Sequence, residues 1–360
     1  MLVAEGLHSL ISQATAEGTL QGISLCHTGP WITHLFFAYD NLLFSRATLG
    51  DCATIQKILS TYERASGQQV NRYKTTLFFS KGTSLNAQDT IKTTLGVLII
   101  QQYEKYLGFP SLVGRNHTAS FSQIKERVWS KLKGWKEKLL SQVGCEILIK
   151  VVAQAIPTYS ISCFKLPNRL CQDLETMIRK FWSGHEQNLN KVSWVRWKTL
   201  CHPKGSGGMG FRELRKFNDA LLGKQVWRLL QDPSSQFHRV FKAKFFLNVT
   251  ILDANPRKRG SYARQSILKA RDVILKGAVW RVGDGKSINI WNQQWLLEEN
   301  HRKVISSPPI VLLNSTVSEL MTPNSQQWDF ALIDHIFQPY DASAIRNIPL
   351  STRATEDRLY

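Results

Sequence analysis

Apolar side chains near the start of the chain recur at helical spacing in two segments. Residues 2–17 place leucine and isoleucine side chains on one face of a helix. Residues 52–66 repeat this spacing, and Gly67 follows them as the kind of residue that ends many helices. The pattern therefore predicts one helix over each segment.

Strand-like runs lie between and after these helices. Residues 33–44 hold two apolar runs that flank a single aspartate, Asp40, and this arrangement predicts a hairpin. Residues 77–79 and 97–99 are short apolar runs that predict strands, and residues 106–110 close this part of the chain. Helices, a hairpin and short strands together indicate an α+β fold.

A strongly basic amphipathic helix is predicted from about Ser120. Its apolar positions recur at helical spacing, at Ile124, Val128, Leu132, Trp135 and Leu139. The other positions carry most of its charge, at Lys125, Arg127, Lys131, Lys133, Lys136 and Lys138. Because aromatic residues at helical spacing usually pack inward, we expect Trp129 and Trp135 in the core and not stacked on bases.

The helical pattern continues beyond this basic helix. A second helix is expected over residues 146–156, where Pro157 stops it, and a third up to Trp182. A fourth is expected over residues 218–230, ahead of Pro233. This part of the chain is therefore expected to be a bundle of helices.

The last part of the chain mixes strands, helices and loops. Residues 279–282 and 288–291 alternate between apolar and polar side chains around Gly283-Asp284-Gly285, which predicts a local hairpin with a glycine-containing turn. Residues 330–337 have helical spacing. A mixed α/β region is expected here.

Composition indicates a folded protein with reduced thiols. The chain has 360 residues, 43% of them hydrophobic, and 11 tryptophans, which is enough for packed cores in two or three domains. Its six cysteines form no C-x-x-C pair, so we expect small buried thiols and neither disulfides nor a zinc site. No apolar run is long enough to span a bilayer and no secretory signal opens the chain, so no membrane partner is expected.

The positive charge is concentrated in the middle of the chain. Residues 121–300 carry 32 lysines and arginines against 14 aspartates and glutamates, whereas residues 1–120 carry 9 against 7 and residues 301–360 carry 5 against 6. A concentrated positive field attracts polyanions, and nucleic acid is the commonest such partner. The alternative is a solvated basic surface that binds nothing specific.

Several motifs resemble those of one family, the non-LTR (LINE-type) reverse transcriptases abundant in plants. Where the family has Phe-Ala-Asp-Asp at a catalytic hairpin, this chain has Phe37-Ala38-Tyr39-Asp40. Residues 65–75 and 106–110 are similar to the next polymerase motif and to the primer-grip motif after it, in the family's order. Blocks with the same order continue through residues 135–228, 279–296 and 328–351, so the resemblance covers about nine-tenths of the chain.

The resemblance implies a domain plan. It implies the C-terminal part of a polymerase palm over residues 1–115, a basic helical thumb over residues 116–235 and a connection region over residues 236–360. The family's first catalytic aspartate and template motif would precede Met1, and its zinc-binding and ribonuclease H segments would follow Tyr360. The chain is thus expected to be a truncated relative.

The resemblance also implies roles for individual residues. Asp40 would be a weak, vestigial metal ligand, because Tyr39 occupies the position of the first aspartate and tyrosine is a poor ligand for the Mg²⁺ that the family uses. Outside that context, one aspartate in a turn is an ordinary turn former. Lys74 would be the general acid that protonates pyrophosphate, or simply a surface lysine. Contacts with nucleic acid are expected from Tyr106, Leu107, Gly108, Lys131, Lys133, Lys136 and Lys138.

Three functions remain open at this point. We expect an inactive reverse transcriptase-like protein that binds RNA or DNA through residues 121–300, with no small-molecule substrate and no productively bound Mg²⁺. An active RNA-directed DNA polymerase is the alternative if another polypeptide completes the palm. A non-catalytic nucleic-acid-binding or scaffold protein is the third. Its compartment, nucleus or cytoplasm, and its oligomeric state stay open.

Overall fold

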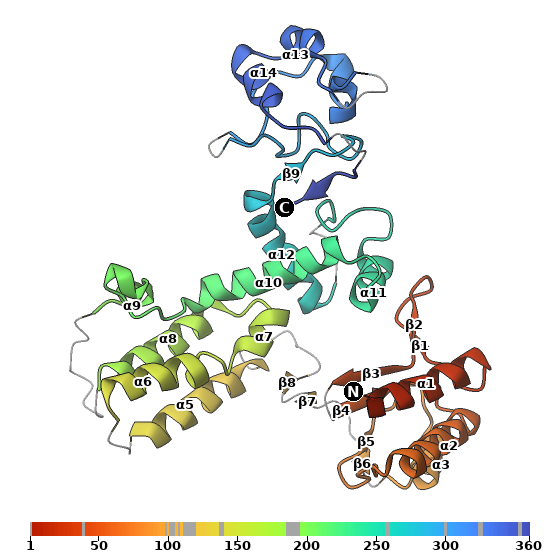
Figure 1. Ribbon diagram of the computed structural model, residues 1–360. Helices are drawn as coiled ribbons and strands as arrows, with labels where there is room; N and C mark the ends of the chain where they lie inside the picture. Colours follow the sequence, from red (N-terminus) through yellow and green to blue (C-terminus); the bar gives the residue numbers. More distant parts are fainter. Residues whose placement is uncertain are drawn as a thin grey trace. The chain divides into compact units, whose positions relative to one another are not determined.

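A computed structural model of the chain forms two compact units, Met1–Arg271 and Asp272–Tyr360 (Figure 1). The residues described are 2–37, 40–97, 99–100, 105–106, 109–110, 120–136, 140–184, 195–255, 260–298, 301–322, 327–351 and 355–360. The domain boundaries expected after residues 115 and 235 stay predictions. The fold is α+β, as the sequence predicted: helices dominate, and the strands of the described residues form two-stranded sheets.

The predicted helices and hairpin at the start of the chain are confirmed. The elements in order are α1 (Leu2–Ala16), β1 (Ile23–Ser24), β2 (Trp31–Ile32), β3 (His34–Phe37), β4 (Asp40–Leu43) and α2 (Leu49–Ser66). Thr48 caps α2 by accepting a hydrogen bond from the backbone N–H of Asp51, and Gly67 ends it with φ 70°. The helix therefore begins and ends where its capping residues lie.

A hydrophobic cluster holds α1 and α2 against the hairpin. Leu7 and Ile11 from α1 are buried together with Ile55 and Ile58 from α2, and Phe36 and Leu43 of the hairpin pack on them among other side chains. The apolar stripe predicted for each helix is the face that enters this cluster. Burying these stripes holds both helices against β3 and β4.

The two short strands expected after α2 are displaced in the structure. They are β5 (Thr76–Leu77) and β6 (Ile99–Ile100), which pair in parallel. A parallel pair needs a crossover, and α3 (Leu85–Leu95) supplies it. The apolar pattern does not indicate α3, because few of its residues are apolar. Its signals were its capping residues, Ser84 before it and Gly96, with φ 64°, after it.

A helical bundle follows. Its elements are α5 (Ser122–Lys136), α6 (Gln142–Leu148), the π-helix η1 (Ile149–Ala153), α7 (Thr158–Cys163), α8 (Asn168–Trp182), α9 (Trp197–Cys201), the 3-10 turn η2 (Lys204–Ser206), α10 (Leu214–Gln231), α11 (Gln236–Phe245) and α12 (Tyr262–Gly277). The helices predicted up to Trp182 and over residues 218–230 are confirmed as α8 and α10. The helix predicted over residues 146–156 is wrong in form, because α6 begins earlier and widens into η1 before Pro157.

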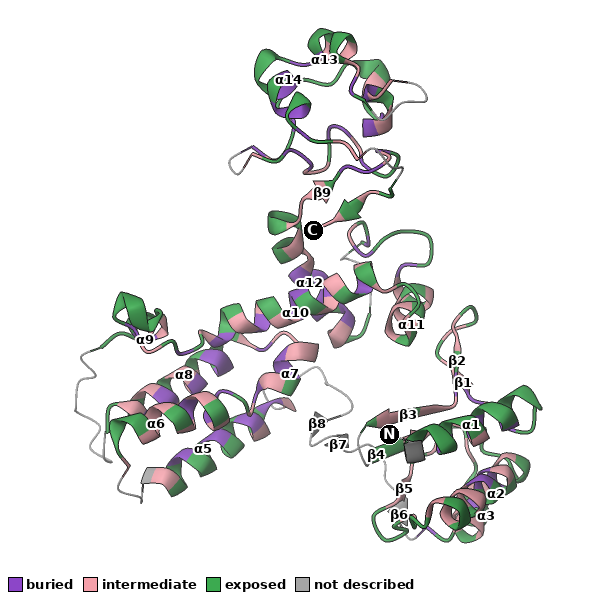
Figure 2. Cartoon of the chain, viewed as in Figure 1, coloured by how far each residue is buried: buried purple, intermediate pink, exposed green. Residues whose placement is uncertain are grey.

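The core of the bundle collects the apolar stripes of its helices. Buried side chains alternate with exposed ones along α8 and α10 (Figure 2). Asn218, 1% exposed, is a polar exception: its side-chain N–H groups donate to the carbonyls of Ile161 at 2.6 Å and Phe164 at 2.9 Å, and its oxygen accepts from Leu166 N at 2.9 Å. One amide thus ties α10 to the turn after α7.

In the second unit the predicted local hairpin over residues 279–291 is wrong. The strand β9 (Trp280–Arg281) pairs with β10 (Arg358–Leu359), far along the chain, and Asn289 instead bridges to Thr316. The reason lies in the loop over residues 283–287. The backbone N–H groups of Gly283, Gly285 and Ser287 all donate to the Asp357 carboxylate, at 2.7 to 2.9 Å. Glycine is required at 283, because a Cβ there would lie 2.3 Å from the carbonyl oxygen of Thr355.

The rest of the second unit packs around buried tryptophans. Its other elements are the 3-10 turns η3 (Ile310–Leu312) and η4 (Val317–Leu320) and the helices α13 (Phe330–Ile336) and α14 (Pro339–Arg346). Trp295 is fully buried, and its indole lies 6.2 Å from that of Trp328. The helix predicted over residues 330–337 is confirmed as α13. Every helix in the described part of the chain is too short or too polar to cross a lipid bilayer.

Candidate nucleic-acid interface

Helix α5 is positioned by its apolar stripe. Ile124, Val128 and Leu132 are each at most 2% exposed and lie in the core of the bundle. Trp135 packs against them, with its indole ring 6.0 Å from the ring of Phe181 in α8. Since this stripe fixes the rotation of the helix, the remaining positions of α5 face outward.

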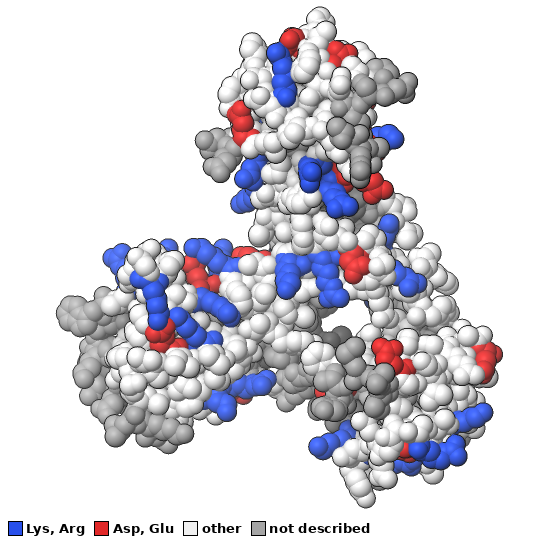
Figure 3. Space-filling model, in the orientation of Figure 1, with Lys and Arg blue, Asp and Glu red and all other residues white. Residues whose placement is uncertain are grey.

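The outward positions of α5 carry exposed lysines. Lys131 and Lys133 are exposed, as predicted, and no ion pair holds either of them among the residues the structure describes. Lys125 instead donates to Asp173 of α8 at 2.7 Å. The side chain of Lys136 and all of Lys138 lie outside the described residues. On the face seen in Figure 3, lysine and arginine side chains spread over the bundle with only scattered acidic ones between them.

Trp129 is not in the core, contrary to the sequence-based expectation. Its side chain is 51% exposed. The reason is its helical position: Trp129 follows the inward-facing Val128 by about 100° of rotation, which takes it off the apolar stripe. A helical-wheel reading of α5 would have shown this. Lys125 and Lys133 lie one turn before and after it, so the exposed indole is flanked by two cations.

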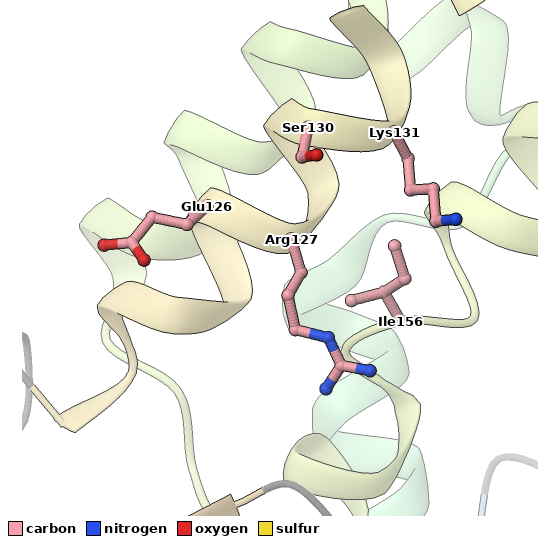
Figure 4. A pocket seen from close by; sticks show the side chains of 5 residues that line it. All are labelled: Glu126, Arg127, Ser130, Lys131 and Ile156. Atoms are coloured by element: carbon pink, nitrogen blue, oxygen red, sulfur yellow. The ribbon is translucent and has the colours of Figure 1, made fainter. Parts of the chain in front are cut away.

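An open hollow of about 350 Å³ borders the other flank of α5. Glu126, Arg127, Ser130 and Lys131 line it from the helix, and Ile156 from the turn after η1. Figure 4 shows Arg127 and Lys131 extending on either side of Ile156, whereas Glu126 points away. Two cationic side chains beside one apolar side chain can hold an anionic group in this hollow.

A second set of lysines, next to α6, shares one acidic partner. Glu146 accepts a hydrogen bond from Lys150 and another from Lys204, both at 2.8 Å. These hydrogen bonds lower the pKa of the Glu146 carboxyl, so it stays ionised at neutral pH. Lys150 also lies 6.0 Å from the centre of the Phe211 ring. The charge of Lys150 is therefore paired within the bundle.

The thiols of the bundle are unreactive. All six cysteines are free, as expected from their spacing. Burial raises the pKa of Cys171 to about 11 and that of Cys201 to about 12, with nearby glutamates adding to the effect. Both thiols are therefore protonated at neutral pH and behave as small apolar side chains.

The hairpin places Asp40 at the start of β4. Phe37 pairs with Asp40 in the ladder, so Ala38 and Tyr39, which lie outside the described residues, connect the two strands. Asp40 is exposed. Within the described part of the chain, no three histidine, cysteine, aspartate or glutamate side chains come close enough to hold a metal ion together. Asp40 therefore belongs to no three-residue ligand group among the described residues.

Lys74 lies in a turn and is not joined to Asp40. Asn71 forms this turn: its side-chain oxygen accepts from Lys74 N at 3.2 Å, and its carbonyl accepts from Thr75 Oγ1 at 2.9 Å. The Lys74 side chain is exposed, and no hydrogen bond or ion pair links it to Asp40, both being described residues. The structure therefore does not bring the two predicted catalytic side chains into contact.

The predicted primer-grip residues are only partly described. The backbone of Tyr106 lies in β7 (Lys105–Tyr106), which pairs with β8 (Phe109–Pro110), and Tyr106 is opposite Phe109. Leu107 and Gly108 lie outside the described residues, between these strands. The role of all three residues stays a prediction.

Comparison with known proteins places the chain in a family. No protein-family model matches it. It is 36% identical over 146 residues to the "Uncharacterized mitochondrial protein AtMg00310" of Arabidopsis thaliana, and the match covers 40% of this chain and 95% of that protein. The chain belongs to the family of that protein. This membership is shown by similarity along almost the whole length of the relative.

A second, longer relative covers more of the chain. The chain is 32% identical over 241 residues to the "Putative ribonuclease H protein At1g65750" of Arabidopsis thaliana. The match covers 66% of this chain but 38% of that protein. The chain therefore spans well under half the length of this relative.

Proposed function

We propose that the chain is a retroelement-derived, reverse transcriptase-like protein that binds nucleic acid and does not polymerise it. The observation that carries this proposal is the outward face of α5, where Lys131 and Lys133 are exposed without acidic partners among the described residues. The longer relative supports it, because its name contains ribonuclease H, an activity on nucleic acid. The resemblance of residues 37–40 to the Phe-Ala-Asp-Asp motif of LINE-type reverse transcriptases supports a polymerase ancestry.

The face of α5 can contact phosphates and bases at the same time. Arg127 and Lys131 lie one turn apart along the hollow, and Trp129 and Lys133 lie one turn apart on the other flank. Cations neutralise phosphates without regard to sequence, whereas an exposed indole offers a base a flat surface on which to stack. Stacking requires an unpaired base, so we propose single-stranded RNA or DNA as the preferred ligand.

The polymerase site is proposed to be inactive because it lacks an acid. Two-metal nucleotidyl transfer needs several carboxylates that hold divalent ions about 3.5–4 Å apart. The hairpin supplies Asp40, whereas Tyr39 replaces the neighbouring acid of the family's motif. A neutral phenol does not bind Mg²⁺ in place of a carboxylate. We propose that no Mg²⁺ is bound productively here, and that polymerisation would require carboxylates in addition to Asp40.

Binding is tested by fluorescence anisotropy with labelled single-stranded RNA, single-stranded DNA and duplex DNA between 50 and 200 mM salt. The double variant Lys131→Glu, Lys133→Glu is compared with the control Lys57→Glu, Lys81→Glu, which reverses two exposed lysines elsewhere in the first unit. Losing two phosphate contacts should lower the slope of log affinity against log salt by about 1.4–1.8. The control should retain the slope of the unmodified chain. An equal change of this slope in the two double variants would refute the interface on α5.

Polymerisation is tested by primer extension on an RNA template with Mg²⁺ or Mn²⁺. We expect no template-dependent incorporation by the purified chain, and none by Tyr39→Asp, because one restored acid does not rebuild a two-metal site. Incorporation above that of an Asp40→Asn variant would contradict the proposed loss of activity. The binding result is independent of this assay, so each half of the proposal can fail separately.

A further inference from the structure

Two histidines face each other between α1 and β3. Nδ1 of His8 lies 2.8 Å from Nε2 of His34, and the two ring centres are 4.9 Å apart with planes inclined at 64°. The residues are 26 positions apart in the chain, so the fold alone brings them together. Neither residue belongs to the proposed nucleic-acid interface on α5.

The outer nitrogen of each imidazole faces a hydroxyl group. Nδ1 of His34 lies 2.9 Å from Thr33 Oγ1, and Nε2 of His8 lies 3.5 Å from Ser12 Oγ. Hydroxyls can accept the N–H of each ring at these outer positions, which leaves the lone pairs of the inner nitrogens facing each other. Metal-binding histidines are usually held in this way, with the second ring nitrogen donating to a neighbouring group that fixes the tautomer.

The scaffold that carries the pair is rigid, and the pair is accessible. Leu7, next to His8, is 3% exposed in the cluster that also contains Phe36, and the His34 ring lies 4.6 Å from the ring of Phe36. His8 is exposed and His34 is half-buried, so an ion can reach them from solvent.

We infer that His8 and His34 form a two-histidine site for a divalent late transition-metal ion that prefers right-angled coordination, namely copper(II) or nickel(II). Metal–imidazole bonds are about 2.0 Å, so two nitrogens at a right angle lie about 2.8 Å apart, whereas tetrahedral zinc would separate them by about 3.3 Å. The observed separation of 2.8 Å is that of a hydrogen-bonded pair, and the same two nitrogens could bind one ion at a right angle without moving apart. Water fills the other positions, because no third histidine, cysteine, aspartate or glutamate joins the pair among the described residues.

Metal binding at this site requires only a change of tautomer. In the metal-free pair the inner nitrogens lie at hydrogen-bond distance, 2.8 Å, so that one of them carries a proton and the other accepts the hydrogen bond. In the complex that proton moves to the outer nitrogen of the same ring, where Ser12 or Thr33 accepts it. Two neutral imidazoles thus bind the ion without a net loss of protons. The ion would link α1 to β3.

The test is a titration of the full chain at neutral pH with copper(II), nickel(II) and zinc(II) chlorides, separately, by calorimetry. The unmodified chain is compared with His8→Gln and His34→Gln, which each remove one ligand and keep all other histidines. The matched control is His27→Gln, which removes an exposed histidine outside the pair. We expect the unmodified chain and His27→Gln to bind one copper(II) more tightly than either variant of the pair. The copper(II) electron paramagnetic resonance spectrum should show coupling to two imidazole nitrogens.

Thermal unfolding separates loss of the site from loss of the fold. Copper(II) should raise the Tm of the unmodified chain and of His27→Gln, and should leave that of folded His8→Gln unchanged. Equal copper binding by all four chains, or coupling to a single nitrogen, would refute the site. Zinc binding as tight as copper binding would contradict the proposed preference for copper(II) or nickel(II). Nucleic-acid binding should be the same in all four chains.

Discussion

Replacing Asp341 by alanine should remove the main buried polar anchor of the second unit. Asp341 is 2% exposed and lies in the first turn of α14. Its carboxylate accepts from Ser306 N at 2.7 Å, Ser306 Oγ at 2.5 Å, Ile305 N at 3.1 Å and His301 Nε2 at 2.7 Å. Alanine leaves these donors without their acceptor, and Ser306 and His301 are at most 7% exposed, so water replaces the carboxylate poorly there. The segment around Ser306 then loses its attachment to α14.

The size of the effect follows from the number of donors. A hydrogen bond to a charged group contributes about 1.5–3 kcal/mol, and a buried donor left without a partner costs about 1–3 kcal/mol. Because the donors share one carboxylate, their contributions are not additive, so we expect Asp341→Ala to lower the free energy of unfolding by about 3–5 kcal/mol. Asp341→Asn keeps the shape and one acceptor oxygen, and should cost less.

The measurement is urea denaturation, combined with hydrogen exchange at the amides of Ile305 and Ser306. The matched control is Asp334→Ala, which removes an aspartate that is 51% exposed and pairs with Arg346. Exposed pairs contribute about 0–1 kcal/mol, so the control should unfold nearly as the unmodified chain does. A loss below about 1 kcal/mol for Asp341→Ala, or unchanged exchange at Ser306, would refute the anchoring role.

The same contact should also depend on pH. Burial disfavours the ionised carboxyl of Asp341, but hydrogen bonds from Ser306 and His301 outweigh this, so the pKa of Asp341 lies below its usual range. A group with a lowered pKa in the folded state contributes stability above its unfolded pKa of about 3.9, and the contribution disappears as the pH falls through the folded value. The stability difference between the unmodified chain and Asp341→Ala should therefore shrink below about pH 4.

Three further substitutions probe other parts of the molecule. Trp129→Ala should weaken binding of single-stranded nucleic acid by about 1–3 kcal/mol in anisotropy, with a smaller effect on duplex DNA; equal losses would argue against stacking. Gly285→Ala should lower the Tm, because φ is +69° and the new Cβ would lie 2.5 Å from Ser318 N; an unchanged Tm would contradict this. Asn218→Ala should cost about 2–4 kcal/mol in urea denaturation by leaving Leu166 N without its acceptor, and a loss under about 1 kcal/mol would show that water replaces the amide.

Segments with strong local signals were predictable from the sequence. The stripe of Ile124, Val128 and Leu132 predicted α5 and which face of it is buried, and the exposure of Lys131 follows from the same pattern. Helix α3 was missed because its capping residues, and not its apolar side chains, mark it. Local patterns predict elements whose stabilising contacts lie within one or two turns.

Features that depend on distant partners were not predictable. The alternation around Gly283 correctly indicated a strand at Trp280 but not its partner, because Asp357 and Arg358 lie too far along the chain to appear in a local pattern. The pairing of His8 with His34 depends in the same way on how α1 packs on β3. The resemblance around Asp40 predicts a polymerase ancestry, but whether the hairpin can hold a metal ion depends on which side chains the fold brings near Asp40, and a local pattern does not give these.

The pairing of β9 with β10 has a consequence for synthesis on the ribosome. A stretch of 74 residues separates Gly283 from the Asp357 carboxylate that binds its N–H group. Until Asp357 and β10 leave the exit tunnel, the loop at Gly283 lacks its acceptor and β9 presents an unpaired edge. Such edges bind other chains readily. The second unit should therefore need chaperone protection during translation, and a ribosome stalled before Asp357 should hold a nascent chain that is sensitive to protease from β9 onward.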